Sequence, residues 1–160
     1  MDHVLSALMP ENCLVMRVCL RYGLRVGDVL ALKPEQVAKG RFTVTEAKTG
    51  KKRRIKIGGS LQRDLLRQSG RWWVFAGRND PRKHRTRQAV YKDVKRACVA
   101  FRLSHISPHS ARKIYAVALR EHGFSFEEIQ HRLNHTDMAT TLIYAMADSI
   151  TEKAPQGRLK

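Results

Sequence analysis

The chain has 160 residues, enough for one domain that buries its own hydrophobic core. Its 31 lysines and arginines against 14 acidic residues give a formal net charge of +17. So large a surplus indicates an anionic partner, most simply nucleic acid. A membrane surface is disfavoured because the basic residues are spread along the chain and do not form one amphipathic helix or a juxtamembrane block.

The cysteines and apolar segments predict a cytoplasmic protein. Cys13, Cys19 and Cys98 lie among apolar residues without C-x-x-C spacing, as expected of reduced core thiols. No secretory signal is recognised, and the apolar run 13–20 contains an arginine and is too short to span a bilayer.

The first part of the chain predicts short helices. Residues 1–9 allow one or two helical turns, and Pro10 opens a helix that ends at Gly23. A shorter helix at 26–32 is expected to end before Pro34. Arg25 stands where these two helices meet. It is either part of a functional site or a surface residue of a solvated loop.

Residues 36–58 change to a period of two and predict a β-hairpin, since Phe42 and Val44 alternate with threonines. Its tip, 48–54, carries Lys48, Lys51, Lys52, Arg53 and Arg54. Such a tip can follow a DNA backbone or groove, although it can also be an edge-protecting solvated turn. Lys48, at the end of the first strand, is the lysine expected to enter a site.

The middle of the chain predicts a helix at 61–68, a short buried run at 72–75 and a basic loop at 77–87. A base-stacking platform is the alternative interpretation of the tryptophans in 72–75. The loop is expected at the rim of a DNA surface through Arg82, Lys83, Arg85 and Arg87. Thr86 should cap a helix extending to about residue 102.

Residues 107–145 predict three helices around a phosphate. Ser107-Pro108 opens the first, and His109 and Arg112, three apart, should point at one ligand from one helix face. Ile114, Val117 and Ala118 are expected on the buried face, and Gly123 at the end. Ser125 should cap the second helix, His135 falls in the following turn, and Tyr144 on the third helix.

The candidate catalytic residues are Arg25, Lys48, His109, Arg112, His135 and Tyr144. Guanidinium groups clamp the extra negative charge of a five-coordinate phosphate. Cations and a histidine can activate a tyrosine phenol, and a lysine can protonate the departing alkoxide. This chemistry needs no metal or other cofactor. A metal site on the pairs His105/His109 and His131/His135 is disfavoured because no H-E-x-x-H motif is present.

The sequence resembles the catalytic domain of the tyrosine recombinase (phage integrase) family. The resemblance lies in Gly-Leu-Arg at 23–25 with Asp28 following, Lys-Thr-Gly at 48–50, H-x-x-R at 109–112, and Leu-Asn-His at 133–135 nine residues before Tyr144. It implies a mainly α fold with a small antiparallel β-sheet (α+β). In the H-x-x-R box the family usually shows Asp-Leu-Arg-His, whereas this sequence has Ser-Ala-Arg-Lys at 110–113. Asn134 stands where Gly is usual, and Asp28 where Glu is usual.

The resemblance also implies the roles. Tyr144 would form a 3′-phosphotyrosyl DNA intermediate; Arg25, Arg112 and His135 would stabilise the transition state, Lys48 would act as general acid, and His109 would accept or position a proton. The expected function is a site-specific DNA recombinase or integrase. A DNA-binding module without recombination activity and a strand-relaxing enzyme similar to type IB topoisomerases are the alternatives.

The expected organisation is a single catalytic domain over 1–160, without the family's N-terminal core-binding domain. Double-stranded DNA is the expected partner, with no membrane. A homo-oligomer, a tetramer on DNA, is expected, and a monomer in isolation is compatible with it. The tail 146–160 is expected to pack on a neighbouring protomer, and the DNA-bound protein to associate with the nucleoid.

Overall fold

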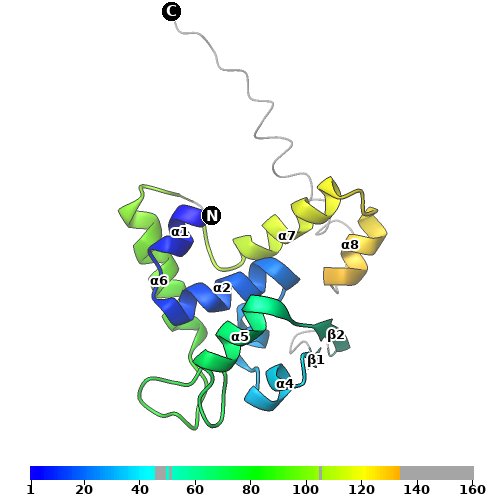
Figure 1. The fold of residues 1–160 in the computed structure, drawn as a ribbon. Helices are drawn as coiled ribbons and strands as arrows, with labels where there is room; N and C mark the ends of the chain where they lie inside the picture. Colours follow the sequence, from blue (N-terminus) through cyan, green and yellow to red (C-terminus); the bar gives the residue numbers. More distant parts are fainter. Residues whose placement is uncertain (46–49, 51, 105, 134–160) are drawn as a thin grey trace, which may run out of the picture. The chain divides into compact units, whose positions relative to one another are not determined.

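The structure is a computed structural model that describes residues 1–45, 50, 52–104 and 106–133 (Figure 1). The chain forms two compact units, residues 1–112 and residues 113–160. The described residues form mostly short helices together with one two-stranded antiparallel sheet, which confirms the predicted mainly α fold class. The elements of the first unit are α1 (Asp2–Ser6), α2 (Pro10–Tyr22), α3 (Val26–Leu30), α4 (Pro34–Ala38), β1 (Arg41–Thr45), β2 (Lys52–Lys56), α5 (Gly59–Gln68) and α6 (Arg87–Ala100).

Helix α2 supplies much of the core of the first unit. Leu14, Val15 and Val18 are buried on it. Pro10 occupies its first turn, where a missing N–H costs nothing. Gly23 ends it in the left-handed region at φ 62°, as a glycine C-cap should. The predicted bounds of this helix are therefore confirmed.

Pro34 has a different role from the one predicted. Helix α3 ends at Leu30, but Pro34 starts a further short helix, α4. The backbone N–H of Lys33 donates to the Gln36 side chain at 2.9 Å, which supports this start. A proline that stops one helix can equally occupy the first turn of the next, because its fixed φ suits that position.

The predicted β-hairpin is confirmed, although residues 36–38, at the start of the predicted segment, belong to α4. Strands β1 and β2 pair antiparallel, with Phe42 opposite Ile55 and Arg41 opposite Lys56. Phe42, Val44 and Ile55 are buried, and the alternate side chains face outward. One face of the hairpin therefore closes the core while the other carries its charges.

Helix α6 lies against the core through Val90, Val94 and Ala97. The Thr86 hydroxyl accepts from the Ala89 N–H at 3.2 Å, which confirms the predicted cap. The helix ends at Ala100, two residues before the predicted limit.

Helix α7 (Ser110–Glu121) begins in the first unit, and α8 (Phe126–Leu133) belongs to the second. Ala116, Ile129 and Leu133 form a small apolar cluster. The predicted burial of Ile114 is wrong, because its side chain is 38% exposed and Ala111 and Ala116 occupy the inner face instead. Ser125 caps α8 as predicted: its hydroxyl accepts from Glu128 N–H at 3.2 Å, and the Glu128 carboxylate accepts from Ser125 N–H at 2.8 Å.

Candidate active site

A cavity of about 320 Å³ in the first unit gathers three of the predicted catalytic residues. Its walls come from the segment after α2, the start of α6 and the residues that lead into α7. Its polar and glycine lining includes Arg25, Gly27, Arg87, Tyr91, His109 and Arg112. Residues more than 80 positions apart in sequence thus meet at one hollow, which is the candidate active site.

Arg112 is the most buried charged residue of this cavity, at 1% exposure. Its Nη1 donates to the carbonyl oxygen of Gly23, the residue that ends α2. A guanidinium stays protonated at any physiological pH and has five N–H donors in a planar fork. Arg112 therefore places a permanent positive charge in the pocket wall and ties the start of α7 to the end of α2.

Arg25 and His109 reach the same cavity from loops. Arg25 is the residue before α3 and is partly buried, whereas His109 is exposed. The prediction that His109 and Arg112 lie on one helix is wrong in detail, because α7 begins at Ser110. The Arg112 N–H still donates to the His109 carbonyl at 3.0 Å, so one turn separates the two residues and both line the cavity.

Helix α6 adds Arg87, which the sequence predicts in the basic loop, and Tyr91, which no sequence pattern singled out. Arg87, predicted at the rim of the basic loop, lines the cavity from the first turn of α6. Tyr91 lines it one helical turn later and is 52% exposed. The i, i+4 spacing of Arg87 and Tyr91 was the available signal, but a tyrosine on a basic helix is equally compatible with a solvated face.

A larger hollow lies elsewhere in the same unit. It has a volume of about 890 Å³ and is lined by Arg17, Arg21 and Lys56 among others. No predicted catalytic residue within the described part of the chain lines it. The smaller cavity is the better candidate site, because it brings together the guanidinium groups of three arginines and the imidazole of His109.

The predicted DNA-binding residues divide into outward and inward groups. Lys52 and Arg54 are exposed on β2, Arg53 is partly buried there, and Arg82 and Lys83 are exposed in the loop. Lys48, Lys51, His135 and Tyr144, the tail 146–160 and His105 lie outside the described residues.

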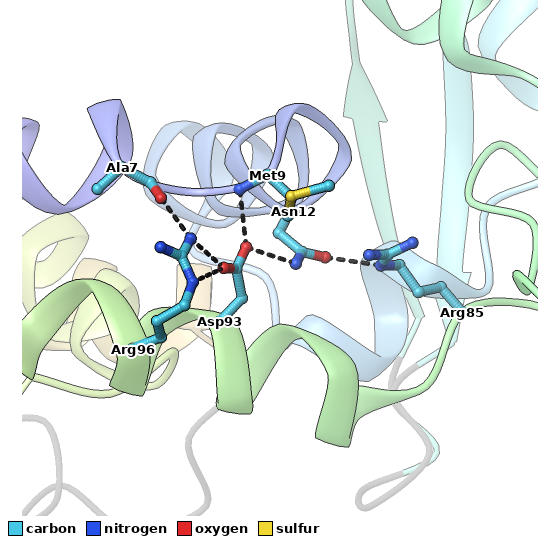
Figure 2. Close-up of polar contacts among 6 residues, drawn as sticks. All are labelled: Ala7, Met9, Asn12, Arg85, Asp93 and Arg96. Carbon is cyan, nitrogen blue, oxygen red and sulfur yellow. Dashed lines mark hydrogen bonds and ion pairs between the residues drawn. The ribbon is translucent and has the colours of Figure 1, made fainter.

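Arg85 points inward and joins a polar network (Figure 2). Its Nε donates to the Asn12 side-chain oxygen at 2.7 Å. The Asn12 amide nitrogen in turn donates to Asp93 at 2.7 Å, and Asp93 also accepts from the Met9 N–H at 2.8 Å. Arg96 donates to Asp93 through Nη2 at 2.6 Å and to the Ala7 carbonyl at 2.6 Å.

Asp93 is the charged centre of this network and is 8% exposed. Burial raises the pKa of its carboxyl, but hydrogen bonds from Asn12, Arg96 and the Met9 N–H outweigh burial and lower the pKa below its ordinary value. The carboxylate form of Asp93 is thus the one that the fold stabilises.

The chain matches the phage integrase family over residues 2–149 and belongs to that family. It is 28% identical over 142 residues to the integrase of Escherichia phage P2, covering 89% of this chain and 40% of that protein. It is 33% identical over 152 residues to the putative integrase/recombinase y4qK of Sinorhizobium fredii, covering 89% and 49%. The chain therefore spans less than half the length of these two relatives.

Solved structures show the same fold. The crystal structure of XerA recombinase superimposes with a TM-score of 0.71 at 18% identity, over 97% of this chain and 62% of that one. A λ integrase (75–356) dimer bound to a COC′ core site matches with a TM-score of 0.66 at 24% identity, over 94% and 54%. In the part of the chain that the structure describes, no helix combines the length and hydropathy needed to cross a membrane.

Proposed function

We propose that the chain is the catalytic domain of a tyrosine recombinase that cleaves and rejoins DNA strands at specific sites. The observation that carries the proposal is the convergence of Arg25, His109 and Arg112 on one cavity. These residues come from separate segments, and membership of the phage integrase family agrees with them. The proposal assigns the whole of 1–160 to this one domain.

In the proposed reaction, the Tyr144 phenolate oxygen attacks the scissile phosphorus and the bond to the 5′ oxygen breaks. The products are a 3′-phosphotyrosyl linkage and a free 5′-hydroxyl, so the phosphodiester energy is kept in the covalent intermediate. Rejoining reverses the step when a 5′-hydroxyl attacks that phosphorus and releases Tyr144.

The cavity residues act on the phosphate in this scheme. Arg25 and Arg112 donate to its non-bridging oxygens, where charge grows in the transition state; a single preorganised donor of this kind typically contributes about 100- to 1000-fold in rate. His109 accepts or positions the phenol proton. His135 adds a further donor, and Lys48 protonates the leaving 5′ oxygen.

Double-stranded DNA is the proposed substrate, and the net charge of +17 supports it. Lys52, Arg54, Arg82 and Lys83 are exposed and would contact the backbone. The solved λ integrase is a dimer bound to its core site, and XerH is bound to its difH substrate. By analogy, we propose that this chain assembles as a homo-oligomer on DNA, with a tetramer as the recombining form.

Trapping on a nicked suicide duplex tests the proposal. The wild-type protein should form a covalent protein–DNA adduct that resists denaturant and forms in the presence of a chelator. Tyr144→Phe should form none while its DNA affinity stays within about twofold, because one hydroxyl contributes little to a surface of many phosphate contacts. An adduct that survives in Tyr144→Phe would identify another nucleophile.

The same assays separate the alternatives. A DNA-binding module would bind with a steep salt dependence and yield no adduct. A strand-relaxing enzyme would relax supercoiled plasmid without a defined site, whereas a recombinase should form adducts at a limited set of sites when mixed DNA is sequenced.

A further inference from the structure

Two walls of the candidate active site come from different helices. Arg25 follows α2, whereas Arg87 and Tyr91 project from the first turns of α6. The width of the cavity therefore depends on where α6 lies relative to α2 and to α3, which packs against it. Apolar contacts alone allow a helix to slide or rotate by small amounts at little cost, so directional contacts near this junction matter.

Asp93 provides such contacts two residues after Tyr91. Its carboxylate accepts from the Met9 N–H at 2.8 Å and from the Asn12 amide at 2.7 Å, both at the start of α2 (Figure 2). Asp93 is 8% exposed and Asn12 is 1% exposed, so these bonds are largely shielded from water. They tie Asp93 on α6 to the residues at the start of α2.

Asn12 also contacts the residues just before α6 through Arg85. Its side-chain oxygen accepts from Arg85 Nε at 2.7 Å, and the Arg85 N–H donates to the Phe75 carbonyl at 2.7 Å. Arg85 lies two residues before Arg87. An amide is the side chain that can donate to Asp93 with one end and accept from Arg85 with the other, which neither Asp nor Leu can do.

We propose that Asn12 and Asp93 are positioning residues that hold the start of α6 in register on α2 and so keep Arg87 and Tyr91 at the active-site wall opposite Arg25. The inference rests on the proposed function, since its role is to shape that site for DNA. The bonds around Asn12 and Asp93 touch no substrate themselves; they act through α6.

The test compares Asp93→Asn and Asn12→Ala with Val37→Ala. Val37 is buried in α4 and lines neither wall of the cavity, so this variant lowers thermal stability without loosening the α2–α6 contact. The rate of adduct formation is measured in a single turnover at saturating nicked duplex, alongside the DNA dissociation constant. All variants are assayed at a temperature at which circular dichroism shows them folded.

Asp93→Asn and Asn12→Ala should each lower the rate at least tenfold, because displacements of about 1 Å in an active site can cost 100-fold. Their DNA dissociation constants should change less than threefold, since most phosphate contacts lie on the exposed basic residues. Val37→Ala should keep the wild-type rate. Equal rates in all three variants, or losses that simply follow thermal stability, would overturn the proposal.

A second measurement does not depend on catalysis. The NMR resonances of the Tyr91 ring and the Arg87 side chain should shift in Asp93→Asn and stay in place in Val37→Ala. If the wild type forms no adduct but these shifts occur, the proposed function fails and the positioning role stands. If adducts form and the resonances do not move in Asp93→Asn, the positioning role fails and the proposed function stands.

Discussion

Replacing Asp93 by alanine should destabilise the fold much more than removing an exposed carboxylate. The change leaves the Met9 N–H and the buried Asn12 amide without their acceptor. A buried donor that loses its acceptor costs about 1–3 kcal/mol, and the partly buried Met9 N–H adds less than the Asn12 amide. Loss of the Arg96 ion pair adds at most about 1 kcal/mol, because that side chain is 58% exposed. The higher helix propensity of alanine offsets roughly 0.5 kcal/mol of this loss in the free energy of unfolding.

The net loss in the free energy of unfolding should be about 3–4 kcal/mol, which corresponds to a fall of roughly 10 °C in Tm for a chain of this size. Equilibrium unfolding in urea, followed by circular dichroism, measures it. Asp64→Ala is the matched control, because the 3.0 Å ion pair between Arg17 and Asp64 has side chains that are 43% and 33% exposed and should contribute at most about 1 kcal/mol. A loss below about 1 kcal/mol for Asp93→Ala, similar to that control, would refute the reasoning.

Three further outcomes are expected. Because the pKa of Asp93 is lowered in the folded state, its carboxylate stabilises the fold fully above about pH 4, the ordinary Asp value, and loses that contribution as the pH falls further. In acid titrations, the difference in the free energy of unfolding between wild type and Asp93→Asn should therefore shrink below that pH. Burial raises the pKa of Cys19 to about 12, so iodoacetamide at pH 8 should alkylate the partly exposed Cys13 first and Cys19 only after denaturation, as read by mass spectrometry; rapid native labelling of Cys19 would contradict this. Gly23→Ala should cost about 1 kcal/mol in urea unfolding because Gly23 sits at φ 62°, whereas Gly27→Ala, without a positive φ, should cost less.

Local sequence signals predicted the ends of helices well where a residue type is favoured at one position of a helix terminus. Gly23 ends α2, Thr86 caps α6 and Ser125 caps α8, because a left-handed glycine and a hydroxyl acceptor act within one helical turn. Pro34 is predicted only to end a helix, but it also starts α4, because the fixed φ of proline suits the first turn of a helix.

Long-range contacts could not be predicted in the same way. Arg85 looks like its exposed neighbours in sequence, yet it turns inward because Asn12, 73 positions away, offers an acceptor. The predicted burial of Ile114 is wrong for the same reason, since the packing of the fold buries the alanines at 111 and 116 and leaves Ile114 38% exposed.

By itself the sequence determined the chemistry that this protein can offer: the residue types, their family order and a strongly basic surface. Those features depend on composition and on the spacing of nearby residues, and both can be seen directly in the amino-acid sequence. The tertiary structure decided which residues share a cavity, since the contact of Arg112 with Gly23 bridges 89 positions and Tyr91 lines the same cavity from α6. Such contacts arise only when the whole core forms, because burial and hydrogen-bond satisfaction are properties of the folded unit.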